Sequence, residues 1–86
     1  MADLIFKFQP RWKEELVVTG PGGQFILDLA MGLLTACLPT EEVWHHKAPV
    51  WAQDYWPQLH CQLKSWCAQN NAELSIDHRS GVYPVP

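Results

Sequence analysis

The chain has 86 residues, enough for one domain with a small core, and 48% of them are hydrophobic while only 17% are charged. Its net charge is −3 with six Lys and Arg residues, so it lacks the basic stripe with which nucleic-acid-binding proteins neutralise phosphates. The low charge and the many aromatic residues also argue against a disordered chain.

The N-terminal third has the pattern of two β-strands and a turn. Apolar and polar residues alternate over residues 3–8 and again over residues 12–19, and Pro10-Arg11 separates the two runs. Gly20-Pro21-Gly22-Gly23 then predicts a tight reversal into a further strand. This glycine-rich turn lacks the lysine and the spacing of a phosphate-binding loop, so we interpret it as structural.

Residues 24–38 allow two interpretations. As two strands, Phe25, Leu27 and Leu29 share one face and Gly32 permits a turn before residues 33–38. As one helix, the segment would be apolar on nearly all sides and would have to be fully buried, which is costly in a domain of this size. We favour the two strands, although the periodicity of short apolar runs does not separate the alternatives.

Two helices are predicted next. The first covers residues 40–47, with Thr40 as its N-cap, and ends before Pro49. The second covers residues 54–70, with Asp54 as its N-cap and Asn70-Asn71 at its end. Its inward stripe, at helical spacing, consists of Trp56, Leu59, Leu63 and Trp66.

The C-terminal residues predict one last strand and a loose end. Residues 73–78 alternate, with Leu74 and Ile76 pointing inward, and residues 80–86 form an extended tail that we expect to be flexible. The whole chain, residues 1–86, is therefore one α+β domain. We expect a mostly antiparallel sheet of about four to five strands, with both helices packed on one face.

Neither a targeting segment nor a disulfide framework is expected. The first eight residues lack a basic leader, and the apolar run at residues 25–38 is shorter than the roughly 20 residues that span a bilayer, so we predict a cytoplasmic protein without membrane contact. The three cysteines are odd in number and form no CxxC unit. We expect reduced thiols.

No set of residues has the pattern of a catalytic site. Adjacent carboxylates such as Glu14-Glu15 diverge rather than converge on one atom. Asp77, His78 and Ser80 lie too close in sequence for a catalytic triad, whose members come from separate elements. We therefore predict a protein that is not an enzyme and needs no cofactor.

A metal or ligand site is the main alternative. His45 and His46 are neighbours and cannot easily bind one ion from a regular helix, so a site would need distant partners. Under this alternative, a small metal- or ligand-binding domain would use the region of His45, His46, His60 and Cys61.

The tryptophans carry the functional prediction. The chain has five, which is more than so small a core is expected to bury completely: Trp12, Trp44, Trp51, Trp56 and Trp66. Helical spacing assigns Trp56 and Trp66 to the core and leaves Trp12 undecided, so Trp44 and Trp51 are the candidates for contact with a partner. The predicted contact surface consists of Trp44, Trp51, Tyr55, Glu41, Glu42 and Asp54.

These residues suggest a small non-catalytic protein-binding domain. Aromatic residues flanked by carboxylates suit an inhibitor or immunity-type protein that neutralises a basic toxin or enzyme by direct contact. The composition also allows a homo-oligomeric structural domain, such as a homodimer that pairs through an exposed strand edge.

Overall fold

The structure is a computed structural model, and it describes residues 5–11, 14–30 and 32–85. Six strands and three helical segments follow one another along these described residues. They are β1 (Lys7–Arg11), β2 (Glu15–Gly20), β3 (Gly23–Ala30), β4 (Thr35–Leu38), α1 (Glu41–Lys47), the 3-10 helix η1 (Val50–Tyr55), α2 (Trp56–Gln69), β5 (Glu73–Ile76) and β6 (Val82–Pro84).

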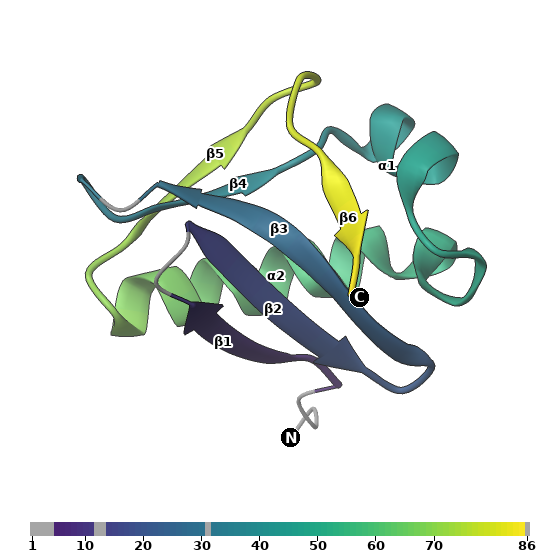
Figure 1. The fold of residues 1–86 in the computed structure, drawn as a ribbon, viewed down its shortest axis with the longest axis horizontal. Coiled ribbons are helices and arrows are strands. Elements are labelled where there is room, and N and C mark those ends of the chain that lie inside the picture. The colour runs from purple at the N-terminus through teal and green to yellow at the C-terminus, as the bar shows by residue number, and fades with distance from the viewer. Residues whose placement is uncertain (1–4, 12–13, 31, 86) are drawn as a thin grey trace.

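All six strands form one mixed sheet, and helix α2 runs along one of its faces (Figure 1). The strand order is β1-β2-β3-β4-β5, and β4 and β5 are the only parallel pair in the described part of the chain. One edge of β3 is divided, because residues 28–30 pair with β4 while residues 25–27 pair with β6. The predicted α+β fold, with a mostly antiparallel sheet and one long and one short helix, is confirmed.

The segment at residues 24–38 contains the two strands β3 and β4, and the alternative of one buried helix is wrong. The turn at Gly20-Pro21-Gly22-Gly23 makes Gly20 the partner of Gly23, and this pairing sets the register of β2 on β3. Phe25, Leu27 and Leu29 then share the face that the helices cover, and all three are buried.

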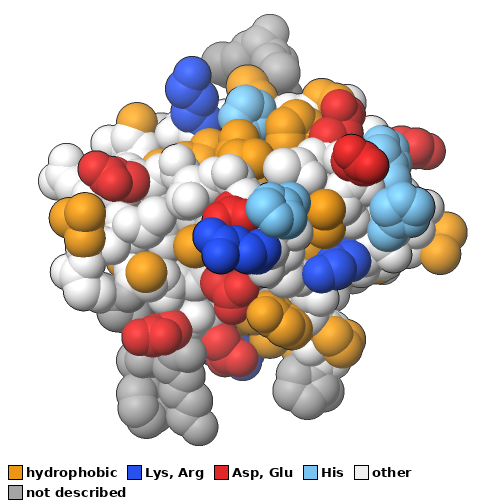
Figure 2. Space-filling view, turned by 90° about the horizontal axis from the view of Figure 1, so that it is seen from above, with side chains coloured by type: hydrophobic (Ala, Val, Ile, Leu, Met, Phe, Trp, Pro, Cys, Tyr) orange, Lys and Arg blue, Asp and Glu red, His pale blue; other side chains and the backbone are white. Residues whose placement is uncertain are grey.

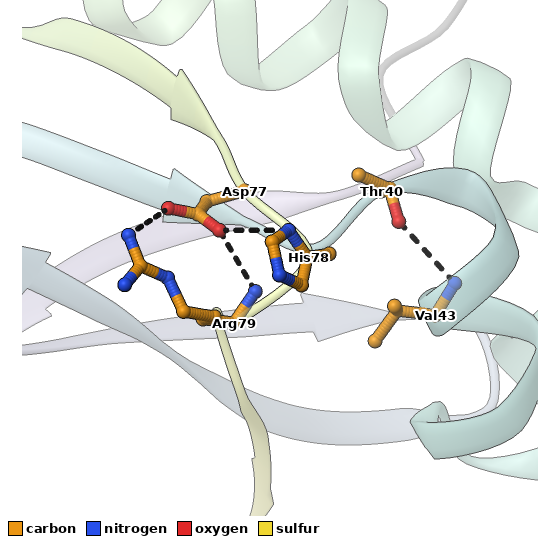
Figure 3. A network of polar contacts seen from close by, with 5 residues as sticks. All are labelled: Thr40, Val43, Asp77, His78 and Arg79. Atoms are coloured by element: carbon orange, nitrogen blue, oxygen red, sulfur yellow. Dashed lines mark hydrogen bonds and ion pairs between the residues drawn. The ribbon is translucent and has the colours of Figure 1, made fainter.

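The ends of the helices follow local capping chemistry, with one difference from the prediction. Thr40 Oγ1 accepts a hydrogen bond from the Val43 N–H at 3.4 Å, which confirms Thr40 as the N-cap of α1 (Figure 3). Asp54 does not cap α2. The chain passes from η1 straight into α2 at Trp56, so Asp54 lies inside the preceding 3-10 helix. At the other end, Asn71 takes the left-handed conformation with φ 53°, as expected of a helix terminator.

The core lies between the sheet and the three helical segments. Leu59 and Leu63 of α2 are fully buried, while Trp56 and Trp66 pack against the core and remain partly exposed. The predicted stripe is therefore real, with the leucines at its centre and the two indoles at its borders.

The structure differs from the prediction at three further places near the chain ends. Strand β1 continues through Pro10 to Arg11, which an edge strand tolerates because its outer side needs no backbone donor. Residues 82–84 form strand β6 on β3 rather than a flexible tail. Ile76 lies on the core side of the sheet, opposite the buried Leu38, but at the end of the edge strand β5 it stays 43% exposed rather than buried. Residues 1–4, Trp12 and Lys13 lie outside the described residues.

Candidate functional site

Trp44, which the sequence predicts at a partner surface, is fully buried. Its ring lies 5.3 Å from that of Phe25, edge to face, and its indole N–H donates a hydrogen bond to the Ala52 carbonyl at 2.8 Å. The buried indole thus has its one polar group satisfied inside the core. Trp44 is a core residue, and its assignment to a contact surface has to be withdrawn.

Trp51 packs on the turn between β2 and β3 and is only partly exposed. A Cβ atom added at Gly20 or Gly22 would lie 2.6 Å or 2.5 Å from the nearest atom of the Trp51 side chain. The ring also lies 6.4 Å from that of Phe6. The glycines of this turn therefore leave room for an indole, which is a structural requirement that the sequence alone does not reveal.

Of the other predicted contact residues, three are exposed acids, and one is an aromatic residue that packs against the edge of the core. Glu41 and Glu42 lie in the first turn of α1, and Asp54 lies in η1. Tyr55 is partly buried, with its ring 6.0 Å from that of Phe6. The structure thus gives this surface exposed carboxylates without a prominent aromatic centre.

The histidines and cysteines do not gather into a metal site in the described part of the chain, where no three His, Cys, Asp or Glu side chains are placed to share an ion. His45 and His46 are exposed on α1, and Cys61 is exposed on α2. His60 stacks on Trp56 with 5.0 Å between ring centres. The metal alternative therefore gains no support from this geometry.

The thiols of Cys37 and Cys67 have raised pKa values, mainly because burial disfavours the thiolate. Asp28 and Asp77 raise the pKa of Cys37 further by repulsion, whereas a hydrogen bond from the Ala36 backbone partly offsets the effect at Cys67. A nucleophilic cysteine needs a lowered pKa, so neither group has the electrostatic setting of an activated thiol.

We expect these two thiols to make the protein less stable in alkali. Above the usual thiol pKa of 9.0 the unfolded chain loses thiol protons that the folded chain retains, so the free energy of unfolding falls as pH rises through that value. Urea unfolding between neutral pH and mild alkali should show this decline, and Cys67→Ala should make it shallower. An equal slope in both proteins would contradict the assignment.

Asp77, His78 and Arg79 form a local turn rather than a catalytic group (Figure 3). The Asp77 carboxylate accepts a hydrogen bond from the Arg79 backbone N–H at 2.9 Å and lies 3.4 Å from the Arg79 guanidinium. These two contacts lower the pKa of Asp77. All three side chains come from one short loop, so their proximity follows from the turn itself.

The sheet face opposite the helices carries an acidic cavity of about 300 Å³. Glu14, Glu15 and Asp28 line it together with Ile26 and Tyr83. The Tyr83 hydroxyl donates to Asp28 Oδ2 at 3.3 Å, and repulsion from the Asp28 carboxylate raises the pKa of this tyrosine, which keeps it protonated. The lining of this cavity is therefore mainly polar.

A mostly apolar hollow lies between strand β1 and helix α2. This cavity of about 310 Å³, which we call the β1–α2 groove, is lined by Phe6, Lys7, Phe8, Gln62, Ser65, Trp66 and Gln69. The rings of Phe8 and Trp66 lie 6.1 Å apart, and both side chains remain partly exposed. The Gln62 side chain ties the helix to the strand, since its Oε1 accepts a hydrogen bond from the Phe6 N–H at 3.0 Å.

The position of the groove could not be read from the sequence. Alternation places Phe6 and Phe8 on the core side of a strand, and helical spacing does the same for Trp66. Neither pattern shows that β1 ends the sheet, and only this position leaves the rings of Phe8 and Trp66 beside solvent. A lysine between two phenylalanines is the one local hint, because charged residues often mark edge strands.

Comparison with protein families, with curated proteins and with solved structures finds no match to this chain. No helix in the described part is both long and apolar enough to cross a membrane.

Proposed function

We propose that this chain is a small non-catalytic domain that binds another protein. The observation that carries the proposal is the β1–α2 groove, in which partly exposed aromatic rings lie beside an edge strand. Aromatic rings that remain accessible at a surface hollow are typical of the centre of protein interfaces.

The size and lining of the groove favour a peptide chain over a small-molecule ligand. Its volume of about 310 Å³ is near the lower end of the roughly 300–1,000 Å³ of small-molecule sites. The polar side chains of its lining come from Lys7, Ser65 and Gln69, which are exposed, and from Gln62, whose carbonyl oxygen is engaged by the Phe6 N–H. Such a groove suits an apolar side chain of a partner, with polar contacts around it.

An inhibitor or immunity-type role is the more specific form of this proposal, in a cytoplasmic setting. It is supported by the net charge of −3 and by the exposure of Glu41, Glu42 and Asp54, which would speed the encounter with a basic target. In Figure 2, acidic, basic and histidine side chains lie scattered over the side of the molecule seen from above, with apolar side chains between them. With a net charge of −3, the acids would steer a basic partner, while apolar contact would supply most of the affinity.

Affinity capture with matched variants tests the proposal. Ser65→Trp fills the β1–α2 groove from an exposed position of α2, and Glu42→Ala removes one acid of α1. We expect the wild-type protein to retain a partner from native extract and Ser65→Trp to retain at least about tenfold less, because an interface centre is sensitive to steric filling. Val50→Ser, at a residue that is 86% exposed and does not line the groove, is the control.

The proposal would be wrong if no protein is retained by the wild type and lost from either surface variant. Loss with Glu42→Ala alone would place the interface on α1 and would still support a protein-binding domain.

A further inference from the structure

We propose that β1 binds an extended segment of the partner protein, which joins the sheet beside β1, inserts an apolar side chain into the β1–α2 groove and places an acidic side chain beside Lys7. This inference rests on the proposed protein-binding function and specifies one segment of the partner, which carries an acid at this site even where the partner as a whole is basic. Its three parts come from the backbone of β1, from the lining of the groove and from the charge of the strand.

The backbone of β1 has groups that point away from β2. In antiparallel strands, residues alternate between pairs that exchange both backbone hydrogen bonds and pairs that exchange none. The two-residue loop makes Gly20 and Gly23 a hydrogen-bonded pair, so Val18 also bonds to β3 and not to β1. Phe8, the partner of Val18 on β1, therefore directs its N–H and C=O outward.

Pro10 independently supports this assignment. Its partner on β2 is Leu16, two residues from Val18. The backbone of Pro10 therefore faces away from β2, as that of Phe8 does. A proline has no N–H to give to a sheet and is accommodated where that position faces away from the neighbouring strand. The N–H of Phe6 is already taken by Gln62, so the site for an added strand is centred on Phe8.

The groove determines which side chain of the added strand is apolar. Side chains of paired residues lie on the same face of a sheet, so the residue opposite Phe8 projects to the side of α2. There it meets the rings of Phe8 and Trp66, whose centres are 6.1 Å apart. An aliphatic or aromatic side chain fits this position, because a polar one would lose its contacts with water between two rings.

Lys7 determines the charge of the residue next to this apolar one in the added segment. It lies on the opposite face of β1, where Thr19 is its partner on β2 and Gln24 is the next residue across on β3. Arg11, on the same face, already has Glu15 as its cross-strand partner. Lys7 is thus the cation of β1 without an acid across the strand, and a carboxylate next to the apolar residue of the added segment would supply one.

The same charges disfavour a second copy of this chain as the occupant. Antiparallel pairing of two β1 strands about Phe8 would place Lys7 opposite Gln9 of the copy and diagonal to its Lys7. Two lysines would then lie on one face at a diagonal distance of roughly 7–8 Å, without a carboxylate in the pairing. We therefore assign the edge to an acidic and apolar segment of a different protein.

Selection from a library of short random peptides displayed on phage tests the inference with a defined probe. We expect the enriched peptides to share an apolar residue directly next to Asp or Glu. A synthetic peptide of that consensus, measured by fluorescence anisotropy, should bind Lys7→Glu about tenfold or more weakly than wild type. Ser65→Trp should weaken binding to a similar extent, and Lys64→Glu, a charge reversal at an exposed residue of α2, should stay within about twofold.

Each result bears on the inference separately from the proposed function. A consensus without acidic residues, or equal effects of Lys7→Glu and Lys64→Glu, would overturn the strand-addition site. Peptides whose binding is lost in Glu42→Ala and kept in Ser65→Trp would overturn it too, while still showing a protein-binding domain. A homodimer in solution that Ser65→Trp dissociates would replace the partner segment by a second copy.

Discussion

Replacing Trp44 by alanine is expected to lower the free energy of unfolding by about 3–5 kcal/mol, the usual cost of removing a large aromatic side chain from a core. The side chain is fully buried, and its ring packs on Phe25. The substitution also leaves the Ala52 carbonyl without its donor, which adds about 1 kcal/mol or more. Because small domains are stable by only about 5–15 kcal/mol, this loss is a large share of the total and should lower the urea midpoint clearly.

Urea unfolding followed by far-ultraviolet circular dichroism measures this loss. Trp44→Phe keeps a ring and removes the N–H, so it should cost less, about 1–3 kcal/mol. Val50→Ala, at an 86% exposed residue, is the matched control and should stay within about 0.5 kcal/mol. A wild-type-like midpoint for Trp44→Ala would show that this indole is not in the core and would restore it as a candidate for partner contact.

Gly22→Ala is expected to destabilise the protein by about 1–3 kcal/mol, as other substitutions that overfill a packed site do. The new Cβ would lie 2.5 Å from the ring of Trp51, and both the indole and the turn would have to move. Gly32→Ala is the matched control in the next turn, because nothing lies within 4 Å of the added atom. That substitution should be neutral or slightly stabilising.

A double-mutant cycle identifies the contact responsible. Trp51→Leu removes the ring, so Gly22→Ala should cost clearly less in the Trp51→Leu background than in the wild type. Thermal unfolding of the four proteins gives the coupling energy. An identical cost in both backgrounds would mean that the turn needs its glycine for backbone reasons alone.

Much of the fold could be predicted because local patterns and tertiary packing agree. The alternation around Phe25, the turn at residues 20–23, the Thr40 cap and the stripe of Leu59 and Leu63 each identify one element from neighbouring residues. Where packing overrides local preference, the predictions are wrong. Strand β1 continues through Pro10 because its outer side needs no donor, and residues 82–84 become a strand because part of the β3 edge is left open by β4.

The candidate site was harder to predict because it depends on neighbours that are distant in sequence. Trp44 and Trp51 lie in a short helix and a proline-rich link, where no local pattern shows which residues they contact. The ring of Trp44 packs on Phe25, and that of Trp51 packs on the glycine turn. Phe8 and Trp66 look like core residues in sequence, and only the position of β1 at the end of the sheet leaves them beside solvent. Periodicity identifies which face of an element is buried. The strand order decides which residues of that face lie at the edge of the sheet and remain exposed to solvent.

Hydrogen exchange at the Phe8 amide, followed by NMR with and without the selected peptide, tests the central claim most directly. In the free protein this N–H points away from β2 and should exchange quickly, while the N–H of Gln9, which faces β2, should be protected. Saturating peptide should slow exchange at Phe8 by about tenfold or more and leave Gln9 nearly unchanged. A bound peptide that leaves exchange at Phe8 unaltered would contradict strand addition at β1.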